Sequence, residues 1–182
     1  MGALAAAMLL IVTLFPGLIE SKAAEFSEYQ VKAAFLLNFT RYVDWPKSSF
    51  AKADSPLVIC ILGQDRFGED LRTLIADKSI EGRKLVLHKV DTIEQCRGCQ
   101  ILFVSQSEKF RFADILQKLK GLPVLTVGDT DGFIAAGGMI NFKTRAERVR
   151  LEINRAAAEK VGLKISSKLL QIADVAGEEP RR

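Results

Sequence analysis

The sequence predicts a single compact α/β domain with a mostly parallel, doubly wound sheet, a C-terminal hairpin and flanking helices. Continuous apolar runs, such as residues 57–62, are typical of strands that are buried on both faces of a parallel sheet. Helix-like segments separate these runs at short intervals, which is the pattern of a doubly wound layer. Two apolar stretches near the C-terminus flank a short polar turn, which predicts a hairpin and makes the sheet mixed.

The N-terminal segment differs in composition from the rest of the chain. Residues 3–19 carry no charge and are rich in Leu, Ala, Ile and Val. Ser21 and Ala23 are the small residues of a signal-peptidase site, so we expect a signal peptide over 1–23. No Lys or Arg precedes the apolar stretch, and an uncleaved membrane anchor is the alternative. Pro16 interrupts the run, which disfavours a membrane-spanning helix, so we expect an exported mature chain without stable membrane insertion.

The remaining composition is that of one packed domain. The chain has 182 residues, of which 48% are hydrophobic and 26% charged, and this suits a domain over 24–176 followed by a flexible polar tail over 177–182. The net charge of +4 comes from scattered basic residues. A solvated surface accounts for this charge, so nucleic-acid binding is not expected.

An amphipathic helix opens the mature domain. Ser27 followed by Gln30 is a capping-box pattern that marks its start. Trp45-Pro46 marks its end, because the residue before a proline resists the α conformation. Lys32 is predicted to lie on one of its polar faces. The core-facing stripe is predicted to consist of Val31, Phe35, Phe39 and Val43.

Leu36 and Leu37 widen the apolar face of this helix beyond one stripe. Surplus apolar area on an exported protein is either covered by a partner or a liability. We therefore expect both leucines to be exposed and to contact a protein partner. The alternative is that they pack inside, against the sheet.

The later elements alternate along the chain. Strands are expected over 57–62, 84–90, 101–104 and 122–127. Helices are expected over 67–76, 110–119, 154–161 and 166–176. The hairpin strands are expected over 139–142 and 149–153, across a polar turn at 143–148. Arg148 and Arg150 alternate with apolar residues, so both lie on one face of the second hairpin strand, as a partner or anion contact or as an ordinary solvated surface.

Three cysteines offer more than one pairing. An odd count in an oxidising compartment leaves one thiol over. Cys96 and Cys99 form C-x-x-C, but Cys99 leads into a strand, whereas a redox C-x-x-C opens a helix. Two ligands are also too few for a structural zinc site, so no metal site is expected. The residues favour one disulfide from Cys60 to either Cys96 or Cys99.

The sequence contains few residue patterns that are typical of catalysis, and we expect neither enzymatic activity nor a cofactor. The single histidine, His88, lies in an alternating strand, where an exposed position is expected. Phosphate-binding glycine loops and a nucleophile elbow are missing from the sequence. The strand at 101–104 ends in Ser105, where a response-regulator receiver has its phospho-acceptor aspartate.

Open α/β sheets bind ligands at the carboxyl ends of their strands. In this sequence those ends carry small polar residues. The candidate ligand-binding residues are Gln64, Asp65, Ser105 and Asp129. The alternative is that they are turn formers and helix caps.

Three segments resemble the YfiR family. The first is Tyr29–Phe39 together with Trp45-Pro46, and the second is Gly137–Phe142. The third comprises Leu151–Asn154 and Gly162–Leu170. Together the three segments span essentially the whole mature chain. Their order and spacing make the resemblance specific.

The resemblance implies a compact α/β fold and a periplasmic repressor. Its partner would be the periplasmic sensor region of an inner-membrane diguanylate cyclase, whose output of cyclic di-GMP it lowers. The family also forms dimers, so a second copy of the chain is a further candidate partner. By similarity, Cys60 and Cys99 are the cysteines that pair, which leaves Cys96 free. A free periplasmic small-molecule binder is the alternative function.

Overall fold

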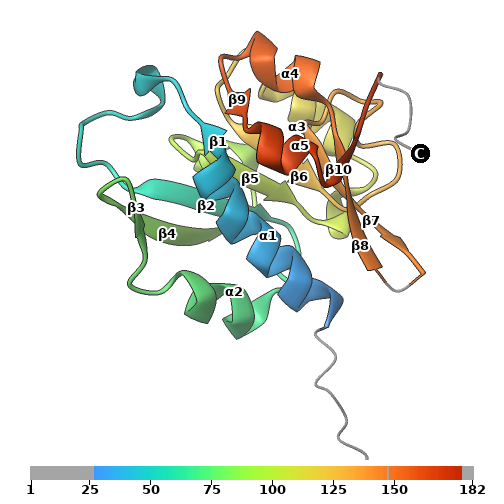
Figure 1. Cartoon of the computed structure of the whole chain (residues 1–182), viewed down its shortest axis with the longest axis horizontal. Coiled ribbons are helices and arrows are strands. Elements are labelled where there is room, and N and C mark those ends of the chain that lie inside the picture. The colour runs from blue at the N-terminus through green and yellow to red at the C-terminus, as the bar shows by residue number, and fades with distance from the viewer. Residues whose placement is uncertain (1–26, 147, 178–182) are drawn as a thin grey trace, which may run out of the picture.

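An eight-stranded mixed sheet forms the centre of the fold (Figure 1). The computed structural model describes residues 27–146 and 148–177, so the predicted signal peptide and all but the first residue of the predicted tail lie outside the described residues. The strand order is β10-β8-β7-β6-β5-β2-β4-β3. The strands are β2 (Leu57–Leu62), β3 (Ser79–Ile80), β4 (Arg83–Val90), β5 (Ile101–Val104), β6 (Leu125–Gly128), β7 (Ile140–Arg145), β8 (Arg148–Ile153) and β10 (Ala173–Val175).

Most neighbouring strands in this sheet are parallel. The run β4-β2-β5-β6-β7 is parallel throughout, whereas β8 pairs antiparallel with β7 and β3 pairs antiparallel with β4. A second, two-stranded sheet joins β1 (Val43–Asp44) to β9 (Lys164–Ile165). The predicted mostly parallel α/β architecture with a C-terminal hairpin is confirmed.

Five α-helices and three 3-10 turns are found among the described residues. The helices are α1 (Glu28–Tyr42), α2 (Gly68–Ile75), α3 (Phe112–Lys118), α4 (Arg155–Lys160) and α5 (Ser167–Leu170). The 3-10 turns are η1 (Lys47–Ser49), η2 (Ile93–Cys96) and η3 (Gln106–Glu108). None of the helices in this part of the chain is long and apolar enough to cross a membrane.

The alternation of side chains along each strand gives the sheet two separate cores. In β2, Ile59 and Ile61 point into the core beneath α1, whereas Cys60 and Leu62 point into the core beneath α3. Strand β5 divides its side chains in the same way. Helices α1 and α2 pack together on the first face (Figure 1). The sheet is therefore covered on both faces, as a buried parallel sheet requires.

The predicted start of α1 is confirmed by its capping box. The Gln30 amide donates to the Ser27 hydroxyl over 3.2 Å, and the Ser27 amide donates to the Gln30 side-chain carbonyl over 3.0 Å. The helix ends at Tyr42, because Val43 takes extended geometry and pairs with Ile165.

The prediction that Leu36 and Leu37 are exposed is wrong. Leu36 is 0% exposed and Leu37 7% exposed, and both belong to the core beneath α1. Because α1 packs against α2 as well as against the sheet, its buried face is wider than one stripe. In the predicted stripe, Phe39 and Val43 are buried, whereas Val31 and Phe35 are only half-buried.

The predicted C-terminal helix over 166–176 is also wrong. Helix α5 covers only its first turn, and the chain then forms β10, which pairs parallel with β8. The Ala176 amide donates to the Ile153 carbonyl over 2.8 Å. Pairing with an open strand edge has overridden local helix preference here. The hairpin strands are likewise longer than predicted, so the turn is shorter.

Candidate functional site

The three cysteines come together in the core beneath α3. Cys60 lies in β2, Cys96 ends η2 and Cys99 precedes β5. All three are buried, and their Sγ atoms lie within 4.8 Å of one another. We call this group the three-thiol cluster.

Local structure explains why Cys96 joins the other two. Strands β2 and β5 are neighbours, with Cys60 opposite Leu102, so Cys99, two residues before β5, lies beside the first half of β2. The Cys99 amide donates to the Cys96 carbonyl over 3.2 Å, which turns the chain back on itself. Either later cysteine is therefore placed near Cys60.

The thiols perturb one another. Contacts with the Cys60 and Cys99 thiols lower the pKa of Cys96, because both can donate to its sulfur. The contact with Cys96 raises the pKa of Cys60, and contacts with Cys60 and then Cys96, together with burial, raise the pKa of Cys99. The three thiols therefore form one interacting group, in which the pKa of Cys96 is the one that is lowered.

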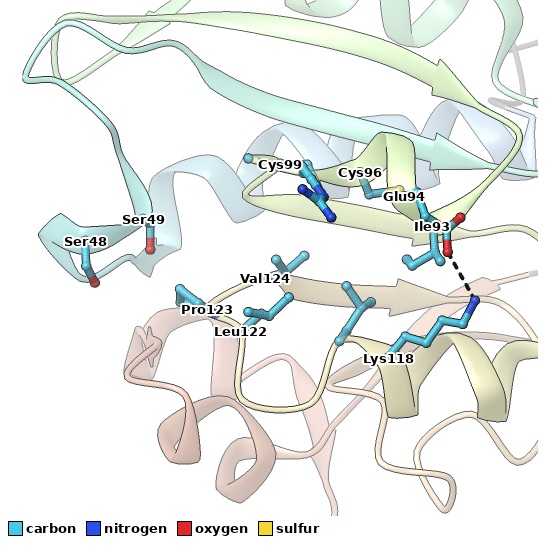
Figure 2. A pocket seen from close by; sticks show the side chains of 13 residues that line it. Ser48, Ser49, Ile93, Glu94, Cys96, Cys99, Lys118, Leu122, Pro123 and Val124 are labelled. Carbon is cyan, nitrogen blue, oxygen red and sulfur yellow. Dashed lines mark hydrogen bonds and ion pairs between the residues drawn. The ribbon is translucent and has the colours of Figure 1, made fainter.

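A surface cavity reaches two of these cysteines. Its volume is about 480 Å³, and Cys96 and Cys99 form part of its wall. Figure 2 shows Leu122, Pro123 and Val124 on the opposite side and the ion pair between Lys118 and Glu94, whose atoms are 3.2 Å apart. The cluster is thus buried but lies directly behind an open pocket.

The predicted strand-end ligand cluster is only partly assembled. The Asp65 carboxylate accepts from the amides of Phe67 and Gly68, over 2.9 and 3.2 Å, so it works as a turn cap at the start of α2. Ser105 is buried, and its hydroxyl has no partner among the described residues. Of the four residues, Asp129 lines a polar cavity.

The crevice where such a sheet would bind a ligand is filled. The order β4-β2-β5-β6-β7 is that of flavodoxin-like sheets, whose switch point lies between the strands equivalent to β2 and β5. There the Gln64 amide donates to the Ser107 hydroxyl over 2.9 Å. A Cβ atom on Gly63, whose φ is +89°, would overlap Ser107 and Glu108. Side chains of the chain itself therefore occupy this position.

Asp129 belongs instead to a buried charge cluster under the first turn of α1. Its Oδ2 accepts from the Tyr29 hydroxyl over 2.6 Å and from Lys32 Nζ over 2.8 Å. Lys32 also pairs with Glu28 over 2.6 Å. The side chains of Lys32 and Asp129 are only 4% and 3% exposed, so the prediction that Lys32 lies on a polar face is wrong.

These contacts shift two neighbouring groups. Burial, and then the hydrogen bond to Asp129, raise the pKa of Tyr29 above its usual range. The hydrogen bond from Lys32 lowers the pKa of Glu28. The sequence held one signal for this site: Tyr29 and Lys32 are three residues apart and so share a helix face.

A polar cavity of about 430 Å³ opens beside this charge cluster. The cations Arg66, Lys143 and Arg145 line it together with Asp129. Within the described ranges, Asp129 Oδ1 and Asn141 Nδ2 are buried without a hydrogen-bond partner. The pocket is therefore suited to a small, charged molecule.

The β7–β8 hairpin carries a cationic face. The register places Arg145 opposite Arg148 and Lys143 opposite Arg150, so four cations share one face. Arg145, Arg148 and Arg150 are exposed. The sequence predicts this for Arg148 and Arg150. Lys143 pairs with Glu152 over 3.1 Å, and the three arginines have no ion pair within residues 27–146 and 148–177.

The fold and these sites define a small α/β protein with a flavodoxin-like strand order, a buried three-thiol cluster and a basic hairpin. Residues 29–174 match the model of the YfiR/HmsC-like family, and the chain belongs to that family. The resemblance stated from the sequence is thereby confirmed.

One solved structure supports the fold independently. A crystal structure of a conserved domain protein from Vibrio cholerae O1 biovar El Tor strain N16961 matches with a TM-score of 0.56 at 12% identity. The match covers 83% of this chain, and this chain spans 60% of the length of that protein. At this identity the likeness concerns the fold alone. The curated proteins contain no significant match.

Proposed function

We propose that this protein is an exported regulator that binds the periplasmic sensor region of an inner-membrane diguanylate cyclase and represses it. The observation that carries the proposal is the family match over residues 29–174. Membership implies a periplasmic regulator of diguanylate cyclase signalling, and proteins of this family are regulatory rather than catalytic.

The cationic face of the hairpin is the proposed contact surface. Like charges placed directly opposite each other on an antiparallel ladder destabilise it, and this hairpin has two such pairs. An acidic surface on the partner would neutralise them. Because rim charges act mainly on association rate and partner choice, such a contact suits a regulator that must also release its target. Leu36 and Leu37 have no part in this surface, since both are buried.

Deletion of the gene tests the function, and charge reversal tests the surface. Deletion is expected to raise cyclic di-GMP and biofilm formation. Complementation with the double variant Arg148→Glu/Arg150→Glu is expected to leave cyclic di-GMP high, although the variant folds and accumulates. The matched control is Lys84→Glu/Lys89→Glu, which reverses two exposed strand cations of β4 and should restore repression.

The two parts of the proposal can fail separately. Unchanged cyclic di-GMP after deletion would remove the regulatory function. Full repression by the hairpin variant would leave the function in place and reject the hairpin as the contact. A pull-down from a membrane extract with the wild-type protein then identifies the partner cyclase.

A second function, small-molecule binding, is favoured by one specific observation. Asp129 Oδ1 and Asn141 Nδ2 are buried without partners, and Asp129 lines the polar cavity. A zwitterion could place its ammonium near Asp129 and its carboxylate near Arg66. A thermal-shift screen of free amino acids tests this, with Arg66→Ala as the variant that should lose any stabilisation. Stabilisation that survives in Arg66→Ala, or no stabilisation by any amino acid, rejects this pocket as a zwitterion site.

A further inference from the structure

We propose that the reduced three-thiol cluster is a binding site for one Cu(I) ion, held by Cys60, Cys96 and Cys99. This site is independent of the proposed contact with a cyclase. It rests on the positions of the three sulfur atoms, on the ligand set and on the adjoining cavity.

The spacing of the sulfur atoms suits a three-coordinate metal ion. A metal about 2.3 Å from each of three thiolates, the usual metal–sulfur distance of thiolate sites, sets the sulfurs about 4 Å apart. In the structure the three Sγ atoms lie within 4.8 Å of one another. Closing around an ion therefore needs shifts of less than an ångström, on the order of a change in side-chain torsion.

The ligand set favours Cu(I) over Zn(II). Thiolates are soft ligands, which select Cu(I), zinc and iron–sulfur clusters. Structural zinc takes four protein ligands. Among the described residues no histidine, aspartate or glutamate joins the three cysteines as a fourth ligand. An ion that is satisfied by three thiolates is therefore the better fit.

The structure also provides an entry path and compensating charge. Cys96 and Cys99 line the open cavity of about 480 Å³, so an ion can reach the cluster from the surface. Arg97 and Lys118 line the same cavity. One Cu(I) and three thiolates leave two negative charges. Lys118 already pairs with Glu94 over 3.2 Å, so Arg97 is the lining cation that offsets part of this charge.

Binding involves ligand exchange without electron transfer. Each thiol releases its proton to solvent, three copper–sulfur bonds form, and the ion leaves the ligands that delivered it. A disulfide between Cys60 and Cys99 uses two of the three ligands. The oxidised and metal-bound states therefore exclude each other, and bound Cu(I) should slow disulfide formation.

The test is a Cu(I) titration of the reduced mature chain without oxygen, against bathocuproine disulfonate as a competing chelator. We expect one equivalent to be retained, and X-ray absorption to show three sulfur ligands around the copper. Loss of a residue that only supports a metal ligand typically lowers metal affinity about tenfold or more. Loss of a direct ligand should lower it by at least as much. Cys96→Ser is therefore expected to bind at least about tenfold more weakly.

Several outcomes would overturn the proposal. One is retention of no copper by the wild-type chain, and another is equal affinity in Cys96→Ser. Two sulfur ligands in the absorption spectrum would assign the metal to a cysteine pair. Zn(II) that displaces the bound Cu(I) would reject the choice of ion. Cys96→Ala, checked by thermal melting, repeats the comparison should the serine variant fail to fold.

Discussion

The two faces of the central sheet are packed in different ways. Beneath α1, aromatic rings follow one another through the core, with Phe39 stacked on Phe142 and Phe67 edge-on to Phe103. Beneath α3 the core is smaller, and the three-thiol cluster takes the place that larger side chains hold on the other face. The first face is stabilised by apolar burial. The second combines less apolar burial with reactive sulfur.

Gly138 shows how closely the second face is packed around the ring of Phe133. A Cβ atom there would overlap Phe133, which is 0% exposed. The close approach of the backbone to the Phe133 ring therefore explains why position 138 of this family-like segment is a glycine. The contrast between the two faces leads to three predictions, and each of them alters residues on one face only.

The largest effect is expected from a charge in the core beneath α1. Leu36→Glu removes a fully buried leucine and buries a carboxylate in its place. Truncation of a buried leucine alone costs about 2–5 kcal/mol, and the charge adds to this, so we expect the domain to unfold. Circular dichroism and thermal melting measure it.

The control for that variant lies two residues earlier on the same helix. Ala34 is exposed, so Ala34→Glu should change the free energy of unfolding by no more than about 0.5 kcal/mol. A folded Leu36→Glu protein with a wild-type melting temperature would show that this leucine does not belong to the core.

The fate of Leu36 shows where sequence reasoning fails. The strands at 57–62 and 101–104 were predictable because a continuous apolar run has one simple interpretation in a buried parallel sheet. Burial of a helix face depends on how many neighbours the helix has. The packing of α2 beside α1 joins residues far apart in sequence, so the width of the buried face could not be predicted locally.

The second prediction concerns the face beneath α3 and the oxidised protein. A disulfide between Cys60 and Cys99 closes a loop of about forty residues, which stabilises the fold by up to about 4 kcal/mol on the chain-entropy model. Reduction should therefore lower the melting temperature, and Cys60→Ala should abolish that redox dependence. Non-reducing peptide mapping is expected to give a peptide that links Cys60 to Cys99.

Cys96 provides the discriminating outcome. In Cys96→Ala the redox dependence of melting should persist, because the predicted pair is intact. A linked peptide that contains Cys96 in the wild-type protein would contradict the pairing. The structure places both later cysteines near Cys60, so the linked peptide identifies which of them pairs.

The two buried clusters were predictable to different degrees. The sequence favours a bond from Cys60 to either Cys96 or Cys99, but it does not predict that all three thiols lie together, which follows from the pairing of β2 with β5 and the turn at 96–99. The sequence marks Asp129 as a strand-end residue, whereas its partners lie about a hundred positions earlier, on α1. A lysine in an amphipathic helix is ordinarily solvated, so its burial is visible only once the aspartate is in place.

The smallest effect is expected from the charge cluster at the edge of the larger core. Lys32→Met keeps the apolar stem but leaves Asp129 buried and without its cation. Removing one partner of a buried pair costs about 3–5 kcal/mol. The Tyr29 hydroxyl still donates to Asp129 over 2.6 Å, so we expect the lower end, about 3 kcal/mol. The double variant Lys32→Met/Asp129→Asn removes the unpaired charge and should recover part of this loss.

The pH dependence of unfolding tests the same cluster from the side of Glu28. Lys32 lowers the pKa of Glu28 in the folded state, so the stability gained is present above the unfolded pKa and is lost as the pH falls through the folded one. Stability should therefore decline on acidification. In Lys32→Met the part of this decline due to Glu28 should shrink, because the hydrogen bond from Lys32 is the largest of the contacts that lower the pKa of Glu28. Urea unfolding at a series of acidic pH values measures both. An unchanged acid limb in Lys32→Met, together with a loss well below about 1 kcal/mol at neutral pH, would mean that the pair is solvated and worth no more than a surface salt bridge.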